Sequence, residues 1–262
     1  MTDLLSKDHT ILERPFMEFR PFGMDERGEK ILDCSGVVVR NNVEYLEACI
    51  GRTHVVEAAA RAVQQLCDLL NERIWDQAYH VTPKFLRNEW HSYSYEFANY
   101  LREFCKVLSG NPQFHFMMGA DRIVSPMIQV LGRPFSLRQI FSMYPHFAQK
   151  FVRGVCEFEA SEVTDHSAVL RQRFTEHALR QLGPYVKACA QNVCDQVKGG
   201  MCSVPEKVHG LPRATVRDRL CIAHGDGWCE WEFSWTQEPR TGLFSLIRKW
   251  LVMPRSRNGG QG

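Results

Sequence analysis

The sequence predicts a mixed α+β fold in which an antiparallel sheet packs against several helices. Residues 155–174 and 215–235 carry alternating apolar and polar side chains, a pattern typical of strands with one buried and one solvated face. Elsewhere, apolar residues recur at spacings of three and four, which is the period of helices. With 262 residues, of which 44% are hydrophobic, the chain is long enough to bury a substantial core.

Charge and cysteine usage restrict the class of protein. The net charge is +2, with 32 basic and 30 acidic residues, so electrostatics give no basis for nucleic acid as a partner. Ten cysteines occur, but residues 1–18 mix charged with apolar side chains and lack the uninterrupted apolar run of a signal peptide. No apolar stretch reaches the roughly 18 residues of a membrane-spanning helix. We therefore expect a cytoplasmic protein with reduced thiols.

Residues 1–80 are predicted to form an amino-terminal extension that is partly helical. Prolines and glycines interrupt residues 1–30, so this segment is expected to be irregular. The short apolar run Gly36-Val37-Val38-Val39 predicts a strand. From Thr53, a candidate N-cap, apolar residues follow helical spacing as far as Leu70.

The middle of the chain is predicted to be helical. One helix begins at Thr82-Pro83 and ends near Gly110, since a capping residue followed by proline starts helices and glycine ends them. Its many aromatic residues indicate either a helix buried on several sides or the wall of an apolar ligand pocket. Two shorter helices are expected within residues 114–151, with breaks at Gly132 and Pro145.

A two-strand hairpin is expected over residues 155–174, with its turn at Thr164-Asp165-His166-Ser167. A further helix is predicted from Glu176 to Val197. The pair Gly199-Gly200 is expected to end that helix, because glycine is the usual C-terminal stop.

The last hairpin is the clearest element. Apolar side chains occupy every second position from Cys229 to Trp235, and the partner strand is predicted over residues 215–223. Cys221 and Cys229 lie symmetrically about Gly225, so a regular hairpin places the two thiols opposite each other.

Two neighbouring thiols are candidate zinc ligands, with packed core thiols as the alternative. The nearest further donors are Asp218, three residues before Cys221, and Cys194 on the preceding helix. Positions three apart on a flat strand face opposite ways, so Asp218 and Cys221 converge only through a bulge or at a strand end.

The segment DRLCIAHGDGWCEWE (218–232) resembles the closing motif of the 4-vinyl-reductase-like domain family. That motif consists of an acidic residue, two residues, a cysteine, a Gly-Asp turn and a second cysteine followed by an aromatic strand. The resemblance covers about residues 82–237. It implies an antiparallel sheet with helices enclosing a small-molecule pocket, and a structural zinc held by Cys194, Asp218, Cys221 and Cys229. Asp218 stands where Glu is more usual, and Cys189 and Cys202 are alternatives to Cys194.

The resemblance implies a bacterial sensory domain that binds a small apolar or aromatic molecule and relays its occupancy to a signalling output. One alternative is an enzyme or accessory protein of tetrapyrrole metabolism. The sequence lacks a phosphate-binding loop and a G-x-S-x-G or H-E-x-x-H motif, which favours the non-enzymatic interpretation. A second alternative is a haem-based gas sensor, because the fold is thought to be related to haem-based nitric-oxide sensors. His115 and His146 are its candidate haem ligands, and a buried histidine without a ligand role is the other interpretation.

Residues 238–262 are predicted to form an amphipathic tail or linker helix. The segment 242–253 is apolar with two embedded basic residues, and too short to cross a bilayer. Four roles are open: docking on the domain's own core, a homodimer interface, a connection to a downstream signalling module, and weak membrane-surface contact through residues 242–257.

Overall fold

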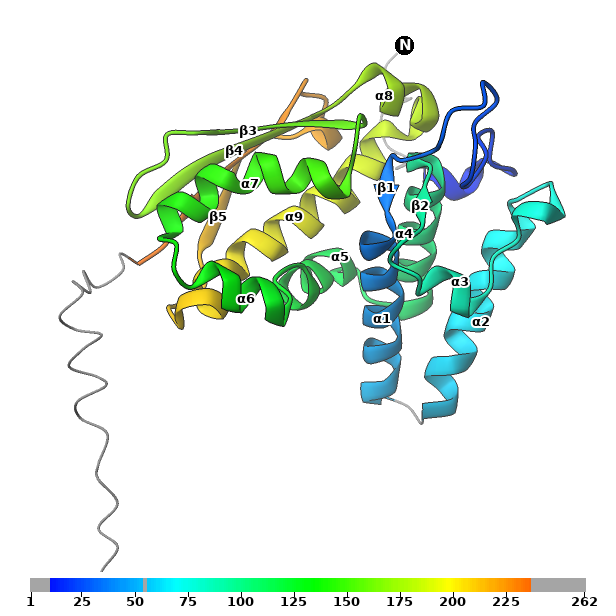
Figure 1. Ribbon diagram of the computed structural model, residues 1–262, viewed down its shortest axis with the longest axis horizontal. Helices are drawn as coiled ribbons and strands as arrows, with labels where there is room; N and C mark the ends of the chain where they lie inside the picture. The colour runs from blue at the N-terminus through cyan, green and yellow to red at the C-terminus, as the bar shows by residue number, and fades with distance from the viewer. Residues whose placement is uncertain (1–9, 54–55, 237–262) are drawn as a thin grey trace, which may run out of the picture.

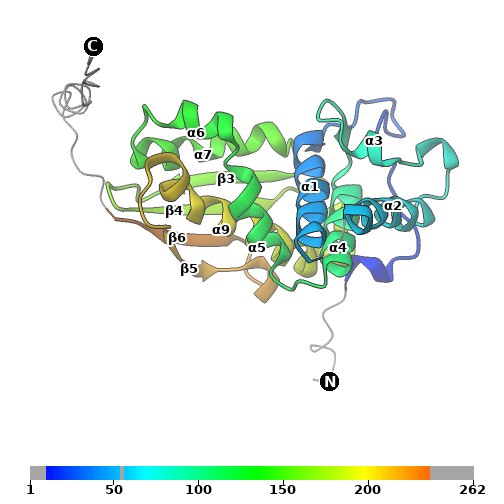
Figure 2. The same cartoon turned by 90° about the horizontal axis from the view of Figure 1, so that it is seen from below.

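The computed structural model describes residues 10–53 and 56–236. A group of helices from the amino-terminal half forms one end of the molecule, and a four-stranded sheet covered by helices forms the other (Figures 1 and 2). The buried apolar residues of both ends belong to one hydrophobic core that runs from Ile11 to Trp235. The predicted α+β class is therefore confirmed.

The amino-terminal end contains short and long helices and one two-stranded ribbon. Its elements are η1 (Ile11–Glu13), β1 (Cys34–Ser35), α1 (Gly36–Thr53), α2 (Val56–Glu72), η2 (Gln77–Tyr79), α3 (Pro83–Leu86), β2 (Ser92–Tyr93) and α4 (Tyr95–Ser109). Strands β1 and β2 pair antiparallel.

Two predictions for this end are wrong. The run from Gly36 to Val39 starts α1 and is not a strand, because Val39 and Val43, one helical turn apart, are both buried when the segment is helical. Thr53 is the last residue of α1 and so does not cap the next helix.

The helix predicted from Thr82 to Gly110 is two helices. The Thr82 side chain accepts the predicted capping hydrogen bond from Phe85 N, but α3 ends at Leu86. Ser94 then caps α4 through Phe97 N, and Gly110, with φ +61°, ends it as predicted.

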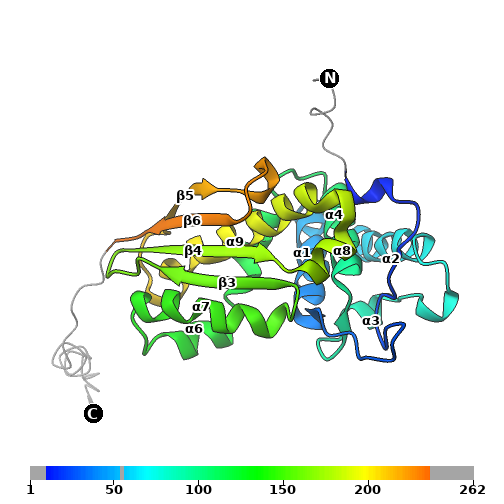
Figure 3. The ribbon, with the colours of Figure 1, turned by 90° about the horizontal axis from the view of Figure 1, so that it is seen from above.

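The remainder of the chain builds the sheet and its cover. The elements are α5 (Phe114–Met118), the π-helix η3 (Gly119–Ile123), α6 (Pro126–Gly132), α7 (Leu137–Phe151), β3 (Cys156–Ser161), β4 (Ser167–Phe174), α8 (Glu176–Leu182), η4 (Gly183–Tyr185), α9 (Val186–His209), β5 (Thr215–Leu220), η5 (Ile222–His224) and β6 (Cys229–Ser234). Both predicted hairpin regions are confirmed as strands, and the order β3-β4-β6-β5 is antiparallel throughout (Figure 3).

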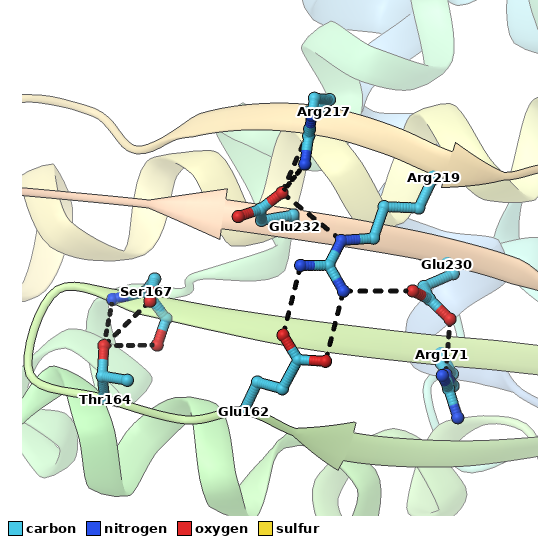
Figure 4. Close-up of polar contacts among 8 residues, drawn as sticks. All are labelled: Glu162, Thr164, Ser167, Arg171, Arg217, Arg219, Glu230 and Glu232. Atoms are coloured by element: carbon cyan, nitrogen blue, oxygen red, sulfur yellow. Dashed lines mark hydrogen bonds and ion pairs between the residues drawn. The ribbon is translucent and has the colours of Figure 1, made fainter.

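The two faces of the sheet differ in chemistry. Helices α7 and α9 cover the face that presents Trp231 and Phe233, both fully buried (Figure 1). The other face carries alternating charges: the Arg219 guanidinium lies 3.2–3.4 Å from carboxylate oxygens of Glu162 and Glu230 (Figure 4). The predicted alternation is thus observed, with one apolar and one charged face.

Helix α9 does not end at Gly199-Gly200 as predicted but continues to His209. These glycines permit close packing: a Cβ added to Gly199 would lie 1.9 Å from the Phe116 carbonyl oxygen, and one added to Gly119 would lie 2.1 Å from the Gln196 carbonyl oxygen. The backbone of α5 and η3 therefore rests directly on α9. Pro145 likewise lies inside α7 and does not break it.

The amino-terminal segment is joined to α4 by a buried ion pair and to α8, at the sheet end, by a hydrogen bond. Arg14 contacts the Glu96 carboxylate, whose side chain is fully buried, and also donates to the Gln181 carbonyl oxygen. The backbone N–H groups of Glu18 and Phe19 donate to the same carboxylate. The division into residues 1–80, 82–237 and 238–262 stays a prediction, and its last segment lies outside the described residues. None of the described helices combines the length and apolar character needed to cross a membrane.

Candidate functional site

Three buried thiols converge where α9 meets the last hairpin. Cys194 lies on α9, Cys221 directly follows β5, and Cys229 begins β6. Their sulfur atoms all lie within 4.8 Å of one another, and the Cys194 and Cys229 sulfurs are 2.8 Å apart. We call these three residues the thiol cluster.

Hydrogen bonds favour a thiolate at Cys221. The contact with the Cys194 thiol lowers the pKa of Cys221 to about 5, helped by the backbone N–H groups of Ala223 and His224 and opposed by burial. The same contact raises the pKa of Cys194 well above its usual range. Since thiolates and not thiols bind metals, the cluster is electrostatically suited to a cation.

Asp218, the fourth predicted ligand, lies outside the thiol cluster. A bulge between Asp218 and Leu220 shifts the register, as convergence would require, yet the Asp218 carboxylate lies 3.2 Å from the Lys198 ammonium. Cys189 and Cys202, the alternatives to Cys194, are also not among the converging residues.

Sequence reasoning missed His224. It ends η5, the turn that begins at Cys221, and its side chain is exposed. It lies three residues after Cys221 in the same turn, and it is not among the residues whose ligand atoms converge with the thiol cluster. The spacing Cys-x-x-His followed by Gly225 was the available signal, because ligand pairs two residues apart are common in zinc sites.

A second group of unusual residues lies in the interior. His115 on α5 is 2% exposed, and neither ring nitrogen has a hydrogen-bond partner. Burial lowers its pKa well below the usual range, and the charges of Arg102 and Lys106 act in the same direction, so the ring is neutral. His146, the other candidate haem ligand, is exposed on α7 and not part of the interior.

Two further buried polar atoms lack partners on the inner face of the sheet. They are the Gln172 side-chain oxygen on β4 and the Trp231 indole nitrogen on β6. Gln172 pairs with Cys229 across the strands, so Trp231 is its diagonal neighbour. An unpaired acceptor and an unpaired donor thus belong to diagonal neighbours on the same face of the sheet. Buried polar groups are nearly always hydrogen-bonded, so such atoms indicate a place where a ligand or water binds.

Arg102 adds a buried positive charge to this interior. It is 2% exposed and contacts the side-chain oxygens of Asn99 and Gln196 and the ring of Tyr95. Among the described residues no carboxylate forms an ion pair with it. A buried guanidinium without a carboxylate favours a negatively charged group nearby.

A surface cavity of about 390 Å³ lies elsewhere. Its lining includes Phe22, Lys30, Phe85, Trp90 and His91, and none of the predicted site residues.

Comparison with solved structures shows the fold. The chain resembles an oxygen-binding H-NOX domain related to soluble guanylate cyclases, with a TM-score of 0.52 and 10% identity over 79% of this chain and 100% of that one. An H-NOX protein from S. oneidensis gives a TM-score of 0.51 and 12% identity, and the match covers 79% of this chain and 98% of that one. A third structure comes from work on how protein-induced porphyrin distortion modulates haem redox potential. It has a TM-score of 0.50 and 9% sequence identity, and the match covers 76% of this chain and 97% of that one.

No family model matches the sequence, and no curated protein matches it either. Since the similar solved structures are H-NOX domains, the predicted membership of the 4-vinyl-reductase-like family is wrong. The cysteine hairpin that suggested it is a local motif of fifteen residues, whereas the likeness to H-NOX domains rests on most of the fold.

Proposed function

We propose that this chain is a sensory domain that binds haem through His115 and relays the occupancy of the haem site. The observation that carries the proposal is a fully buried, neutral histidine with two unpartnered ring nitrogens, inside a fold similar to that of H-NOX domains. A haem iron needs a neutral imidazole nitrogen as its axial ligand, and His115 offers one.

The surrounding residues fit the donor chemistry of haem in two respects. Phe114 and Met118, both fully buried, supply apolar surface beside His115. Arg102, a buried cation without an ion-pair partner among the described residues, suits a haem carboxylate, whereas Lys106 is already paired with Glu103. When bound, haem supplies an iron that takes up a diatomic gas.

Haem reconstitution tests the proposal. Full-length protein is incubated with haemin, reduced, and measured by absorption, with His115→Leu as the test variant and His146→Leu as the control. We expect a Soret band that shifts with nitric oxide or carbon monoxide, is lost in His115→Leu and persists in His146→Leu. Absence of a stoichiometric Soret band in the wild-type protein would exclude a haem sensor.

The unpaired atoms of Gln172 and Trp231 favour a second candidate function, the sensing of a small apolar molecule with one polar group. A hydroxyl group can donate to the Gln172 oxygen and accept from the Trp231 indole N–H, which satisfies both buried atoms. Substituted phenols are a suitable probe in a thermal-shift measurement. Stabilisation that is lost in Gln172→Leu but retained in the control Gln64→Leu, on the surface of α2, would support this candidate over haem.

The thiol cluster is proposed as a structural zinc site. Three thiolates supply three of the four tetrahedral ligands, and either Asp218 or His224 completes the set. A site closed by four protein ligands leaves no position for a reactive water, so the metal would fasten α9 to the last hairpin. A homodimer, a downstream signalling module and membrane-surface contact stay predictions, as does the tetrapyrrole alternative.

A further inference from the structure

Helix α6 exposes an apolar surface to solvent. Met127, Val130 and Leu131, at helical spacings of three and four, are 69%, 63% and 62% exposed. Ile128 and Phe135 extend the same surface. We call these five residues the α6 face. Large apolar side chains grouped this way usually mark a binding surface.

The opposite side of α6 is anchored to the domain. A Cβ placed on Gly132, the last residue of α6, would lie 3.2 Å from a methyl of Val208 on α9 and 3.8 Å from Ile140 on α7. The helix is therefore held at one position while its outer face has no described partner.

The described chain ends at the same end of the molecule. The ring of Trp235, just after β6, stacks on Phe141 near the start of α7, with centroids 4.4 Å apart. The Trp235 indole also donates to the Asp165 carbonyl oxygen in the turn between β3 and β4. Only residues 133–136 separate α6 from α7, so the chain leaves the sheet beside the α6–α7 unit (Figures 1 and 3).

The residues that follow have the sequence of a complementary element. Residues 243–253 read LFSLIRKWLVM, and Leu243, Ile247, Trp250 and Leu251 share one side of a helix by spacing. Arg248 and Lys249 lie on the other side. Eleven helical residues span about 16 Å, longer than the roughly 10 Å of α6. The six residues 237–242 can span up to about 20 Å between the end of the sheet and such a helix.

We propose that residues 243–253 dock as an amphipathic helix on the α6 face of the same chain. Five exposed side chains are far fewer than the roughly 20–30 residues per partner of a stable protein interface, which disfavours a second copy. A tethered segment needs less contact, because a short linker holds it at an effective concentration of about millimolar. The proposal concerns a surface away from His115 and the thiol cluster and does not depend on either.

Hydrogen exchange of the full-length protein tests the docking. We expect the amides of 243–253 to be protected in the wild type, and Val130→Asp/Leu131→Asp to speed their exchange about tenfold or more. The matched control, Val107→Asp/Leu179→Asp, places two charges at exposed apolar positions on α4 and α8 and should leave the exchange unchanged. In the reciprocal experiment, Ile247→Asp on the docking segment should speed the exchange of the α6 amides.

Three outcomes would overturn the proposal. Equal exchange of 243–253 in wild type and Val130→Asp/Leu131→Asp would show that the α6 face does not hold the segment. Protection that disappears on dilution together with a dimer in light scattering would identify a second copy as the occupant. Protection that arises only with vesicles containing anionic lipid would identify a membrane surface.

Discussion

The sulfur atoms of Cys194 on α9 and Cys229 on β6 lie 2.8 Å apart, although 34 residues separate the two cysteines in sequence. A disulfide requires about 2.05 Å, and two thiolates on one tetrahedral zinc with bonds of about 2.3 Å lie about 3.8 Å apart. The observed distance lies between these values. The two sulfurs are thus closer together than in a zinc site, and metal binding would increase the distance between them by about 1 Å.

Protein purified without chelator should contain about one zinc per chain. The three thiolates of the thiol cluster, completed by either Asp218 or His224, would form a tetrahedral site. Cys194→Ser/Cys229→Ser should lower the zinc content to near zero. Cys67→Ser, at a fully buried thiol on α2, is the control and should retain the metal. Elemental analysis gives the zinc content, and thiol titration shows whether a disulfide has replaced the metal.

The identity of the fourth ligand is a separate prediction. His224→Gln should weaken zinc affinity about 10-fold or more if His224 is the ligand, and Asp218→Asn should do so if the hairpin rearranges to bring Asp218 inward. We expect the larger loss from His224→Gln, because Asp218 is paired with Lys198 while His224 lies in the turn that directly follows Cys221. Competition with a chromogenic chelator measures both affinities. A larger loss from Asp218→Asn would assign the site to the set predicted from the sequence.

The stability of the ligand-free protein should fall as the pH drops below about 6.5, the ordinary pKa of histidine. Burial depresses the pKa of His115 in the folded state, so protons bind the unfolded chain first, and the stabilisation present above this pH is lost on acidification. At pH 5.5 this histidine alone should cost on the order of 1 kcal/mol. Urea unfolding at pH 7.5 and 5.5 should show a smaller pH effect in His115→Leu than in wild type. An identical pH effect in both would mean that His115 protonates freely in the folded state.

Gly199→Ala should destabilise the protein severely, by about 3 kcal/mol or more, because its Cβ would lie 1.9 Å from the backbone oxygen of Phe116 and no side chain can yield there. Gly51→Ala is the matched control. Gly51 is also helical, but a Cβ added to it meets nothing within 4 Å, so alanine should stabilise α1 by up to about 1 kcal/mol. Denaturant unfolding compares the two. Equal effects of the two substitutions would contradict the direct contact of α5 with α9.

Arg14→Ala should destabilise the protein by about 3–5 kcal/mol, because it leaves the fully buried Glu96 carboxylate without its counter-ion. Arg213→Ala removes the guanidinium from a pair with Glu206 in which both side chains are nearly half exposed, and should cost less than about 1 kcal/mol. Denaturant unfolding measures both losses. If Arg14→Ala costs as little as Arg213→Ala, the buried ion pair between Arg14 and Glu96 does not stabilise the fold.

Prediction from sequence succeeded where local rules decide the structure. The alternation from Cys229 to Trp235, the cap at Thr82 and the stop at Gly110 each depend on neighbours a few residues away, and each is observed. It failed at Gly36–Val39 and at Gly199-Gly200, where packing against a distant helix overrides local preference.

By itself, the sequence determined that this chain forms an α+β fold with two antiparallel hairpins, because strand periodicity is a local property. It also predicted that the thiols of Cys221 and Cys229 lie close together, which is observed, although Cys221 lies just outside β5 and a bulge shifts the register before it. Only the tertiary structure decided which distant residues meet. It brought Cys194 to the hairpin, turned Asp218 toward Lys198, and left His115 buried without a hydrogen-bond partner. These outcomes depend on how α9, α5 and the sheet pack together, and side-chain spacing within one element carries no information about that packing.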